Sequence, residues 1–159
     1  LATSSAASDV YKRQIIINSI NIKNNFVVED KYEKKLRKGL NFGHTIGHAI
    51  ETHFMSSDKK LLHGEAIAIG IIIESYLSQK MYGFDIEKVD KIKNHLLTIF
   101  PKIKFNSKAI NNIIKMMEHD KKNTKDEINF VLLSDIGKLI FDVNVPNSNI
   151  LKAFEYYGE

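Results

Sequence analysis

Cysteine is absent from the 159 residues of this chain. The protein therefore has no disulfides and no thiolate ligands, so a transition metal would have to be held by imidazole and carboxylate groups. The lack of disulfides also fits a reducing compartment, and we expect a cytoplasmic protein.

Long hydrophobic runs are missing as well. The longest covers residues 66–73 and ends at Glu74, which is far short of the ~18 residues that a membrane-spanning helix needs. The sequence shows no signal-peptide pattern. We therefore expect no association with a membrane.

Charge of one sign is in modest excess, with 23 Lys and Arg residues against 19 Asp and Glu, and the pI is about 9.1. A basic balance suits nucleic acid, an acidic surface or an anionic small molecule. The lysines are scattered and lack the interleaved arginine and aromatic residues of a nucleic-acid platform. We expect an anionic small-molecule substrate and no nucleic acid.

The N-terminal residues 1–14 are small and polar and show no periodicity. We expect them to be disordered or foreign to the natural protein, and we expect one folded domain over residues 15–159. Residues 15–28 predict a helix, although their many β-branched side chains leave a strand as the alternative. The charged residues 29–38 predict a turn or a short helix.

Helical spacing predicts further helices over residues 40–54, 63–83, 86–100 and from Ser107 to a polar break at residues 120–123, with a loop at residues 55–60. The segment 66–73 is apolar on every side and should be buried. Residues 128–133 and 138–143 predict a β-hairpin, and Pro146 opens a last helix that ends near Tyr157. The predicted fold class is mainly α, a multi-helix domain with one β-hairpin.

The residues best suited to metal binding or catalysis lie after residue 36. His44 and His48 are four residues apart, so they share one face of a helix, and Glu51 lies near the same stripe. His63 follows after a polar break. A lone His-x3-His pair is more often two partly buried residues than a metal site, and this pair lacks the Glu of the zinc-protease motif His-Glu-x-x-His.

Glycine also recurs every four residues in this stretch, at Gly39, Gly43 and Gly47. A glycine inside a helix costs about 1 kcal/mol relative to alanine. The repetition therefore predicts that another helix or a ligand presses close on this backbone.

Taken together, these groups resemble the signature of the 3-dehydroquinate synthase family. Its pattern Arg-x3-Asn-x-Gly-His-[Thr/Ser]-x-Gly-His-Ala-x-Glu is present from Arg37 to Glu51, and Leu-His-Gly-Glu-Ala-x-Ala-x-Gly from Leu62 to Gly70. The resemblance extends over about residues 15–157 and implies the C-terminal, metal- and substrate-binding domain of a two-domain enzyme. The implied reaction converts 3-deoxy-D-arabino-heptulosonate 7-phosphate to 3-dehydroquinate with loss of phosphate, in the shikimate pathway.

The resemblance also implies roles for single residues. His44 and His63 would bind Zn²⁺ or Co²⁺ as neutral imidazoles, and His48 and Glu33 would transfer protons. Glu51 would orient His48 or His44, or would simply pair with a surface lysine. The implied substrate-binding residues are Lys23, Arg37, Asn41 and one of the pair Lys121 and Lys122.

Two parts of the family's machinery have no counterpart in this sequence. There is no Gly-rich phosphate loop for NAD, and the third metal ligand is a glutamate that in the family precedes the matched region. We therefore expect the chain by itself to bind metal weakly and not to turn over, and we expect the complete protein to bind NAD and to form a homodimer.

Other classes of protein remain open. One alternative is a related sugar-phosphate cyclase or a metal-dependent alcohol dehydrogenase, and another is a non-catalytic helical interaction module. The related cyclases differ where they meet the acid end of the substrate, so the presence of Lys23, Arg37 and Asn41 favours 3-dehydroquinate synthase. If the chain is an interaction module, added metal should not change its folding. If it is part of the enzyme, zinc or cobalt should stabilise it once the upstream segment is restored.

Overall fold

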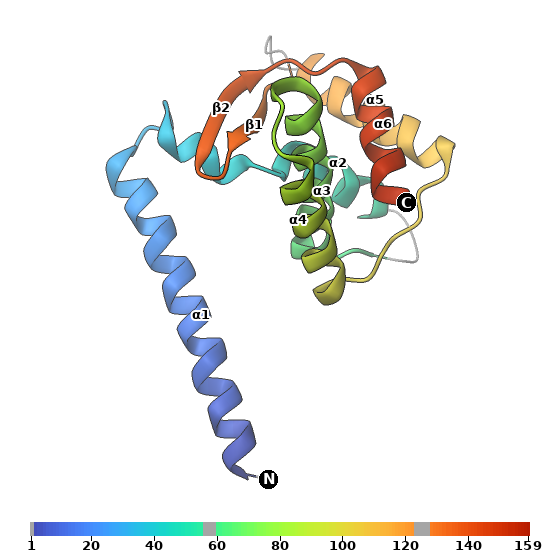
Figure 1. Cartoon of the computed structure of the whole chain (residues 1–159). Helices are drawn as coiled ribbons and strands as arrows, with labels where there is room; N and C mark the ends of the chain where they lie inside the picture. Colours follow the sequence, from blue (N-terminus) through green and yellow to red (C-terminus); the bar gives the residue numbers. More distant parts are fainter. Residues whose placement is uncertain (1, 56–59, 123–127) are drawn as a thin grey trace. The chain divides into compact units, whose positions relative to one another are not determined.

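The computed structural model describes the backbone of residues 2–55, 60–122 and 128–159, and the side chains of residues 8–55, 60–118 and 128–159 (Figure 1). It forms two units, Leu1–Leu40 and Asn41–Glu159. The elements are α1 (Ala2–Glu29), the 3-10 helix η1 (Leu36–Asn41), α2 (His44–Met55), α3 (His63–Tyr82), α4 (Ile86–Ile99), α5 (Ser107–Lys122), β1 (Phe130–Asp135), β2 (Lys138–Val143) and α6 (Asn147–Gly158). The predicted fold class, mainly α with one hairpin, is confirmed.

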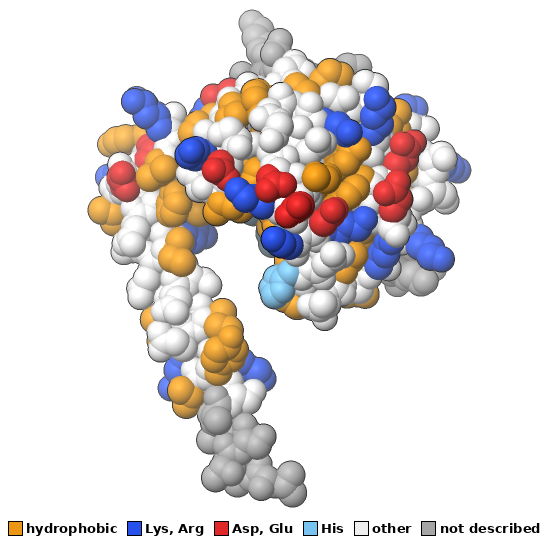
Figure 2. All heavy atoms as spheres, viewed as in Figure 1, with side chains coloured by type: hydrophobic (Ala, Val, Ile, Leu, Met, Phe, Trp, Pro, Cys, Tyr) orange, Lys and Arg blue, Asp and Glu red, His pale blue; other side chains and the backbone are white. Residues whose placement is uncertain are grey.

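The first unit is dominated by α1, which begins at Ala2 rather than at residue 15. Residues 2–14 are therefore helical where we expected no regular structure, and residues 15–28 form a helix rather than a strand. Once a helix has nucleated, each further residue adds a hydrogen bond at little cost, and the alanines near the start are the strongest helix formers. Ile16 and Ile20 of α1 are about 60% exposed. Hydrophobic side chains are visible on the surface of this helix in Figure 2.

The charged segment after α1 forms the predicted turn, and Asp30 organises it. Its carboxylate accepts hydrogen bonds from the backbone N–H groups of Lys34 (3.0 Å), Lys35 (2.7 Å) and Arg37 (3.1 Å). These backbone donors, that of Lys34 first, lower the pKa of Asp30 below its usual value. Glu33 lies inside the turn with a φ of 52°, a left-handed conformation that non-glycine residues rarely adopt.

The core of the second unit is built around α3, which packs against α2, α4, α6 and β1. The all-apolar segment at its start is buried as predicted, and Ile69, Ile72 and Ile73 are at most 3% exposed. The helix ends at Gly83, whose φ of 71° gives the left-handed cap that favours glycine. None of the described helices is long and apolar enough to cross a lipid bilayer.

The β-hairpin is also confirmed. β1 and β2 are antiparallel, with Phe130 opposite Val143 and Leu132 opposite Ile140. α5 differs from its prediction, because it continues to Lys122 through the expected polar break; the last residue of that break, Asn123, lies outside the described residues. Charged residues destabilise a helix far less than Gly or Pro does. A helix whose apolar stripe is already packed can therefore extend through them.

The helix that carries the histidines starts four residues later than predicted. Leu40 and Asn41 belong to η1, and Gly43 adopts a φ of 83°, so α2 begins at His44. This kind of start depends on a left-handed residue, which helical periodicity does not reveal. The loop expected at residues 55–60 falls largely outside the described residues.

Two of the regularly spaced glycines, Gly43 just before α2 and Gly47 within it, contact α3, as their spacing predicted. A Cβ atom built on Gly47 would lie 2.6 Å from Ile67 Cδ1, and one built on Gly70 would lie 2.0 Å from the Gly43 carbonyl oxygen and 2.9 Å from the Gly47 nitrogen. The two backbones therefore touch at these glycines. No larger residue fits at position 70 without separating α2 from α3.

Candidate metal centre

Three histidines of the second unit converge where α2 passes the start of α3. The ring centroids of His44 and His48 are 5.4 Å apart, those of His44 and His63 are 5.9 Å apart, and those of His48 and His63 are 5.3 Å apart. A zinc-type ion binds imidazole nitrogens at about 2.0–2.1 Å, so rings at these separations can share one ion.

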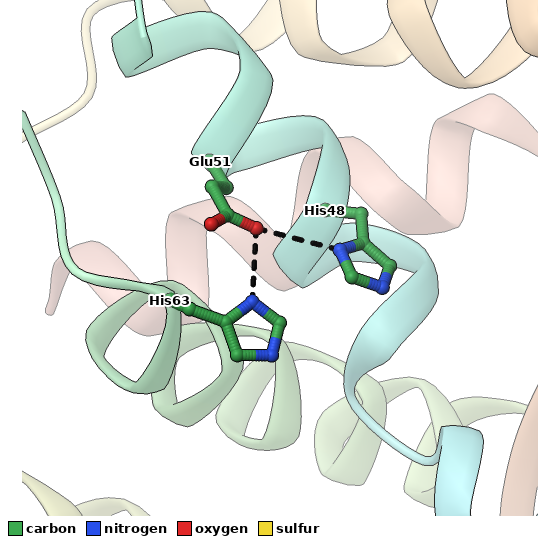
Figure 3. Close-up of side chains that lie close together, drawn as sticks. All are labelled: His48, Glu51 and His63. Carbon is green, nitrogen blue, oxygen red and sulfur yellow. Dashed lines mark hydrogen bonds and ion pairs between the residues drawn. The ribbon is translucent and has the colours of Figure 1, made fainter.

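Glu51 joins two of these rings. Its Oε2 atom accepts a hydrogen bond from His63 Nδ1 at 2.9 Å and a longer one from His48 Nδ1 at 3.4 Å (Figure 3). The hydrogen bond from His63, the larger of the two effects, holds the pKa of Glu51 below its usual value. An ionised carboxylate only accepts hydrogen bonds, so both Nδ1 atoms carry hydrogen and both Nε2 atoms are left as the basic nitrogens.

The backbone orients the His44 ring in the same way as Glu51 orients the other two rings. Its Nδ1 atom lies 3.2 Å from the carbonyl oxygen of Phe42, which can only accept. All three imidazoles therefore have Nδ1 directed to an acceptor, the arrangement that commonly fixes a metal-binding histidine with Nε2 toward the ion. A donor set of neutral imidazoles suits Zn²⁺ or Co²⁺, so the residues present fit the metal that the sequence implies.

A second set of three residues also comes together at this place. Ligand atoms of His48, Glu51 and His63 lie within 4.8 Å of one another, whereas the sequence assigns the metal to His44 and His63. The short distances within this set are the Nδ1–Oε2 hydrogen bonds described above. Because a carboxylate engaged by two imidazole N–H groups orients those rings, we assign Glu51 to orientation and keep His44 and His63 as the predicted ligands.

Glu51 thus matches one of its two predicted roles. Its carboxylate pairs with His48 and His63, and it pairs with no lysine among the described residues. The sequence-based expectation named His48 or His44 as its partner, and the stronger of its two contacts is instead to His63. His63 is twelve residues away in sequence, which no helical spacing could have indicated.

Glu74 is a further residue of this region that the sequence analysis did not select. It is fully buried, and its two carboxylate oxygens accept hydrogen bonds from the backbone N–H groups of Gly43 (2.6 Å) and Ile46 (3.2 Å). Burial raises the pKa of Glu74 to about 8, and the backbone donors oppose part of that rise. A signal was present in the sequence, because a lone acid ends the all-apolar run 66–73.

The pH dependence of stability should reveal Glu74. Its pKa is about 8 in the folded state and near 4.5 without burial, so between these values only the folded state holds the proton. The contribution of Glu74 is complete below about pH 4.5 and is lost as the pH rises toward 8, at about 1.4 kcal/mol per pH unit. Urea unfolding of the metal-free complete protein at a series of pH values measures this slope. The Glu74→Gln variant should lack that component, and an unchanged pH dependence in the variant would contradict the assignment.

Three of the predicted substrate-binding and proton-transfer residues lie in the first unit. Lys23 is exposed on α1. Glu33 and Arg37 pair with each other, with Arg37 Nε 3.6 Å from Glu33 Oε2, and Arg37 Nη1 donates to the carbonyl oxygen of Lys31 at 3.1 Å. Their predicted roles in binding and proton transfer stay predictions.

The other predicted substrate-binding residues belong to the second unit. Asn41 is the last residue of η1, two residues before the left-handed Gly43. Lys121 and Lys122 are the last two residues of α5, and their side chains lie outside the described residues. On the face drawn in Figure 2, Lys and Arg side chains are interspersed with Asp and Glu, so no single-sign patch dominates that face.

Comparison with known proteins finds the same family along most of the chain. The family described as 3-dehydroquinate synthase C-terminal matches residues 2–123. A 3-dehydroquinate synthase of Parabacteroides distasonis is 37% identical over 149 residues, which are 94% of this chain and 42% of the relative. One of Helicobacter pylori is 37% identical over 145 residues, covering 89% of this chain and 41% of the relative. The chain thus spans about two fifths of the length of these curated relatives.

Solved structures agree on the fold. A 2-deoxy-scyllo-inosose synthase in complex with carbaglucose-6-phosphate, NAD⁺ and Co²⁺ matches with a TM-score of 0.69 and 29% identity, over 86% of this chain and 38% of that chain. A 2-epi-5-epi-valiolone synthase of Streptomyces hygroscopicus with NAD⁺ and Zn²⁺ bound matches with a TM-score of 0.60 and 20% identity, over 84% of this chain and 36% of that chain, and shows the shared fold alone. With its signature motifs, its helical fold and the family match in agreement, the chain belongs to the 3-dehydroquinate synthase C-terminal family.

Proposed function

We propose that the complete protein containing this chain is a 3-dehydroquinate synthase, which converts 3-deoxy-D-arabino-heptulosonate 7-phosphate to 3-dehydroquinate. The observation that carries the proposal is the convergence of His44, His48 and His63, each with Nδ1 directed to an acceptor. Three basic Nε2 atoms are then left for a metal ion and for proton transfer. The relatives with this name add support through the length of their match.

His44 and His63 would hold the metal ion. When bound, a zinc-type ion would supply Lewis acidity at the substrate oxygen that is oxidised, and NAD would supply reversible hydride transfer. Similar enzymes have been solved with NAD⁺ and Co²⁺ or Zn²⁺ bound. Glu51 keeps the His63 ring in the tautomer that presents Nε2, because its carboxylate accepts the hydrogen on Nδ1.

His48 would move protons. Its Nδ1 hydrogen is held by Glu51, so the proton that it exchanges with the substrate is carried at Nε2. Imidazole is the side chain best suited to both accept and donate a proton near neutral pH. The His48 side chain is 59% exposed, which leaves it accessible to a substrate. Glu33 is the second proton-transfer residue of the proposal.

The anionic groups of the substrate would be bound by cations and an amide. Arg37 offers a planar fork that suits a carboxylate or a phosphate, while Lys23 and one of Lys121 and Lys122 offer point charges. Asn41 can both donate to and accept from hydroxyl groups. This set suits a substrate that carries a carboxylate at one end and a phosphate at the other.

A second candidate function is a related sugar-phosphate cyclase. The specific observation in its favour is the similarity to 2-deoxy-scyllo-inosose synthase, which was solved with carbaglucose-6-phosphate. Such a substrate has a phosphate and hydroxyl groups but no carboxylate. The two candidates therefore differ in the acid end of the substrate.

Phosphate release distinguishes these functions. The complete protein, supplied with NAD and Co²⁺ or Zn²⁺, is expected to release inorganic phosphate from 3-deoxy-D-arabino-heptulosonate 7-phosphate and not from glucose 6-phosphate. Release from glucose 6-phosphate alone would favour the related cyclase, and release from neither would favour a non-catalytic module. The His63→Ala variant is the control for phosphatase contamination, because it should show no release.

A further inference from the structure

The second unit contains a buried acid that the proposed mechanism does not use. Among the described side chains, Glu74 is the charged residue with an exposure of 0%. Burying a carboxyl group is costly unless hydrogen bonds compensate, so its partners indicate why it is there. Those partners are backbone groups of another helix.

Glu74 acts as the N-terminal cap of α2. The first N–H groups of any helix lack partners within the helix and need an acceptor from elsewhere. Gly43, which precedes α2, has no side chain that could cap it. The two oxygens of Glu74 instead accept the N–H groups of Gly43 and Ile46, at 2.6 Å and 3.2 Å.

This cap lies next to one predicted metal ligand and in register with the other. His44 is the first residue of α2, directly between the two capped N–H groups. On α3, Glu74 follows His63 by three helical turns and therefore lies on the same face of that helix.

The two helices are consequently joined at two places. Glu51 of α2 binds the ring of His63 at the start of α3, and Glu74 of α3 binds the start of α2. The contact of Gly70 with the backbone of α2 lies between these two links. Sliding α2 along α3 would break both links.

We infer that Glu74 is a positioning residue for the metal centre, which holds the first turn of α2 so that His44 and His63 face one ion. The inference rests on the proposed function, because it takes these two histidines as ligands. A cap that only stabilises α2 would affect the stability of the fold. The inference goes further, because it requires that loss of Glu74 weakens metal binding more than it weakens the fold.

The test compares two substitutions of Glu74 with a matched control in the complete protein. Glu74→Gln keeps the volume but places an amide N–H₂ against a backbone N–H, and Glu74→Leu removes both acceptors. The control is Ser78→Ala, one turn further along α3. Ser78 is equally buried. Its hydroxyl group donates to the Glu74 backbone carbonyl oxygen within α3 at 2.7 Å and accepts from the Leu133 N–H at 2.9 Å, so it links α3 to β1 and not to α2.

Two readouts separate positioning from stability. Zn²⁺ affinity, measured by competition with a chromogenic chelator, is expected to fall on the order of 10–100-fold in Glu74→Leu and by less in Glu74→Gln. The visible absorption spectrum of bound Co²⁺, which reports ligand geometry, should change in both variants. Ser78→Ala should lower the thermal midpoint while leaving the Zn²⁺ affinity and the Co²⁺ spectrum as in the wild type.

Three results would overturn the inference. The first is wild-type Zn²⁺ affinity and an unchanged Co²⁺ spectrum in both Glu74 variants. The second is a loss of Zn²⁺ affinity in Ser78→Ala equal to that in the Glu74 variants, when the thermal midpoints of these proteins are the same. The third is retention of Zn²⁺ by His63→Ala, which would refute the proposed function as well, whereas the first two leave it standing. If Glu74→Leu does not fold, Glu74→Gln alone decides between these outcomes.

Discussion

Substitution of His63 by alanine is expected to strip the divalent metal from the complete protein and to abolish turnover. His63 is predicted to be a direct ligand, and its ring is fixed by Glu51 so that Nε2 is the basic nitrogen. Loss of an outer partner of a metal ligand already costs about 10–100-fold in affinity, so loss of a ligand should cost more. Metal content after dialysis, measured by atomic emission, checks the expectation.

His44→Ala is the informative companion of this variant. If His44 and His63 are the ligands, both variants lose the metal. If the ion is held instead by His48, Glu51 and His63, whose ligand atoms lie within 4.8 Å of one another, His44→Ala keeps it. His95→Ala, at an exposed position of α4, is the matched control and should retain full metal content. Wild-type metal content in both His44→Ala and His63→Ala would refute the ligand assignment.

The second large effect is expected for His48→Ala, which should keep the metal and lose turnover. Removing a side chain that transfers protons in the transition state typically costs about 10²–10⁴-fold in rate. The reason to expect selectivity is that His48 shares Glu51 with His63 but, by the family resemblance, does not bind the ion. The measurement is kcat from phosphate release, with metal content determined on the same preparation.

Two outcomes would contradict this role for His48. An undiminished kcat would remove His48 from the chemistry. A loss of metal as complete as in His63→Ala would make it a ligand rather than a proton-transfer residue. Glu51→Gln helps to separate these possibilities. An amide cannot accept from both Nδ1 atoms as the carboxylate does, so this substitution should weaken metal binding and turnover together.

Local patterns in the sequence predicted the elements that depend on neighbouring residues. Helical spacing placed His44 and His48 on one helix, and the apolar run after His63 predicted the buried α3. The predicted end of one helix at residue 83 and the predicted start of the next at residue 86 agree with α3 and α4. Both bounds depend on local features, the left-handed cap at Gly83 and the Asp85 carboxylate that accepts the Glu87 N–H. Helical spacing and helix caps each depend on a few neighbouring residues, so the sequence alone is enough to predict them.

The errors fall where structure depends on more than the local pattern. α1 begins at Ala2 because a helix already formed downstream can extend through a polar segment that would not form one alone. α2 begins at His44 because Gly43 turns left-handed against α3. Neither outcome follows from periodicity, which averages over several turns and is blind to a single backbone angle.

The sequence by itself determined the family, the mainly helical fold and the three histidines that could form a site. Only the tertiary structure decided how those histidines are held, through Glu51 bound to His63 and Glu74 bound to the start of α2. These contacts join residues 12 and 31 positions apart. They follow from the packing of two helices at their glycines, and no pattern along one helix specifies where its neighbour will lie.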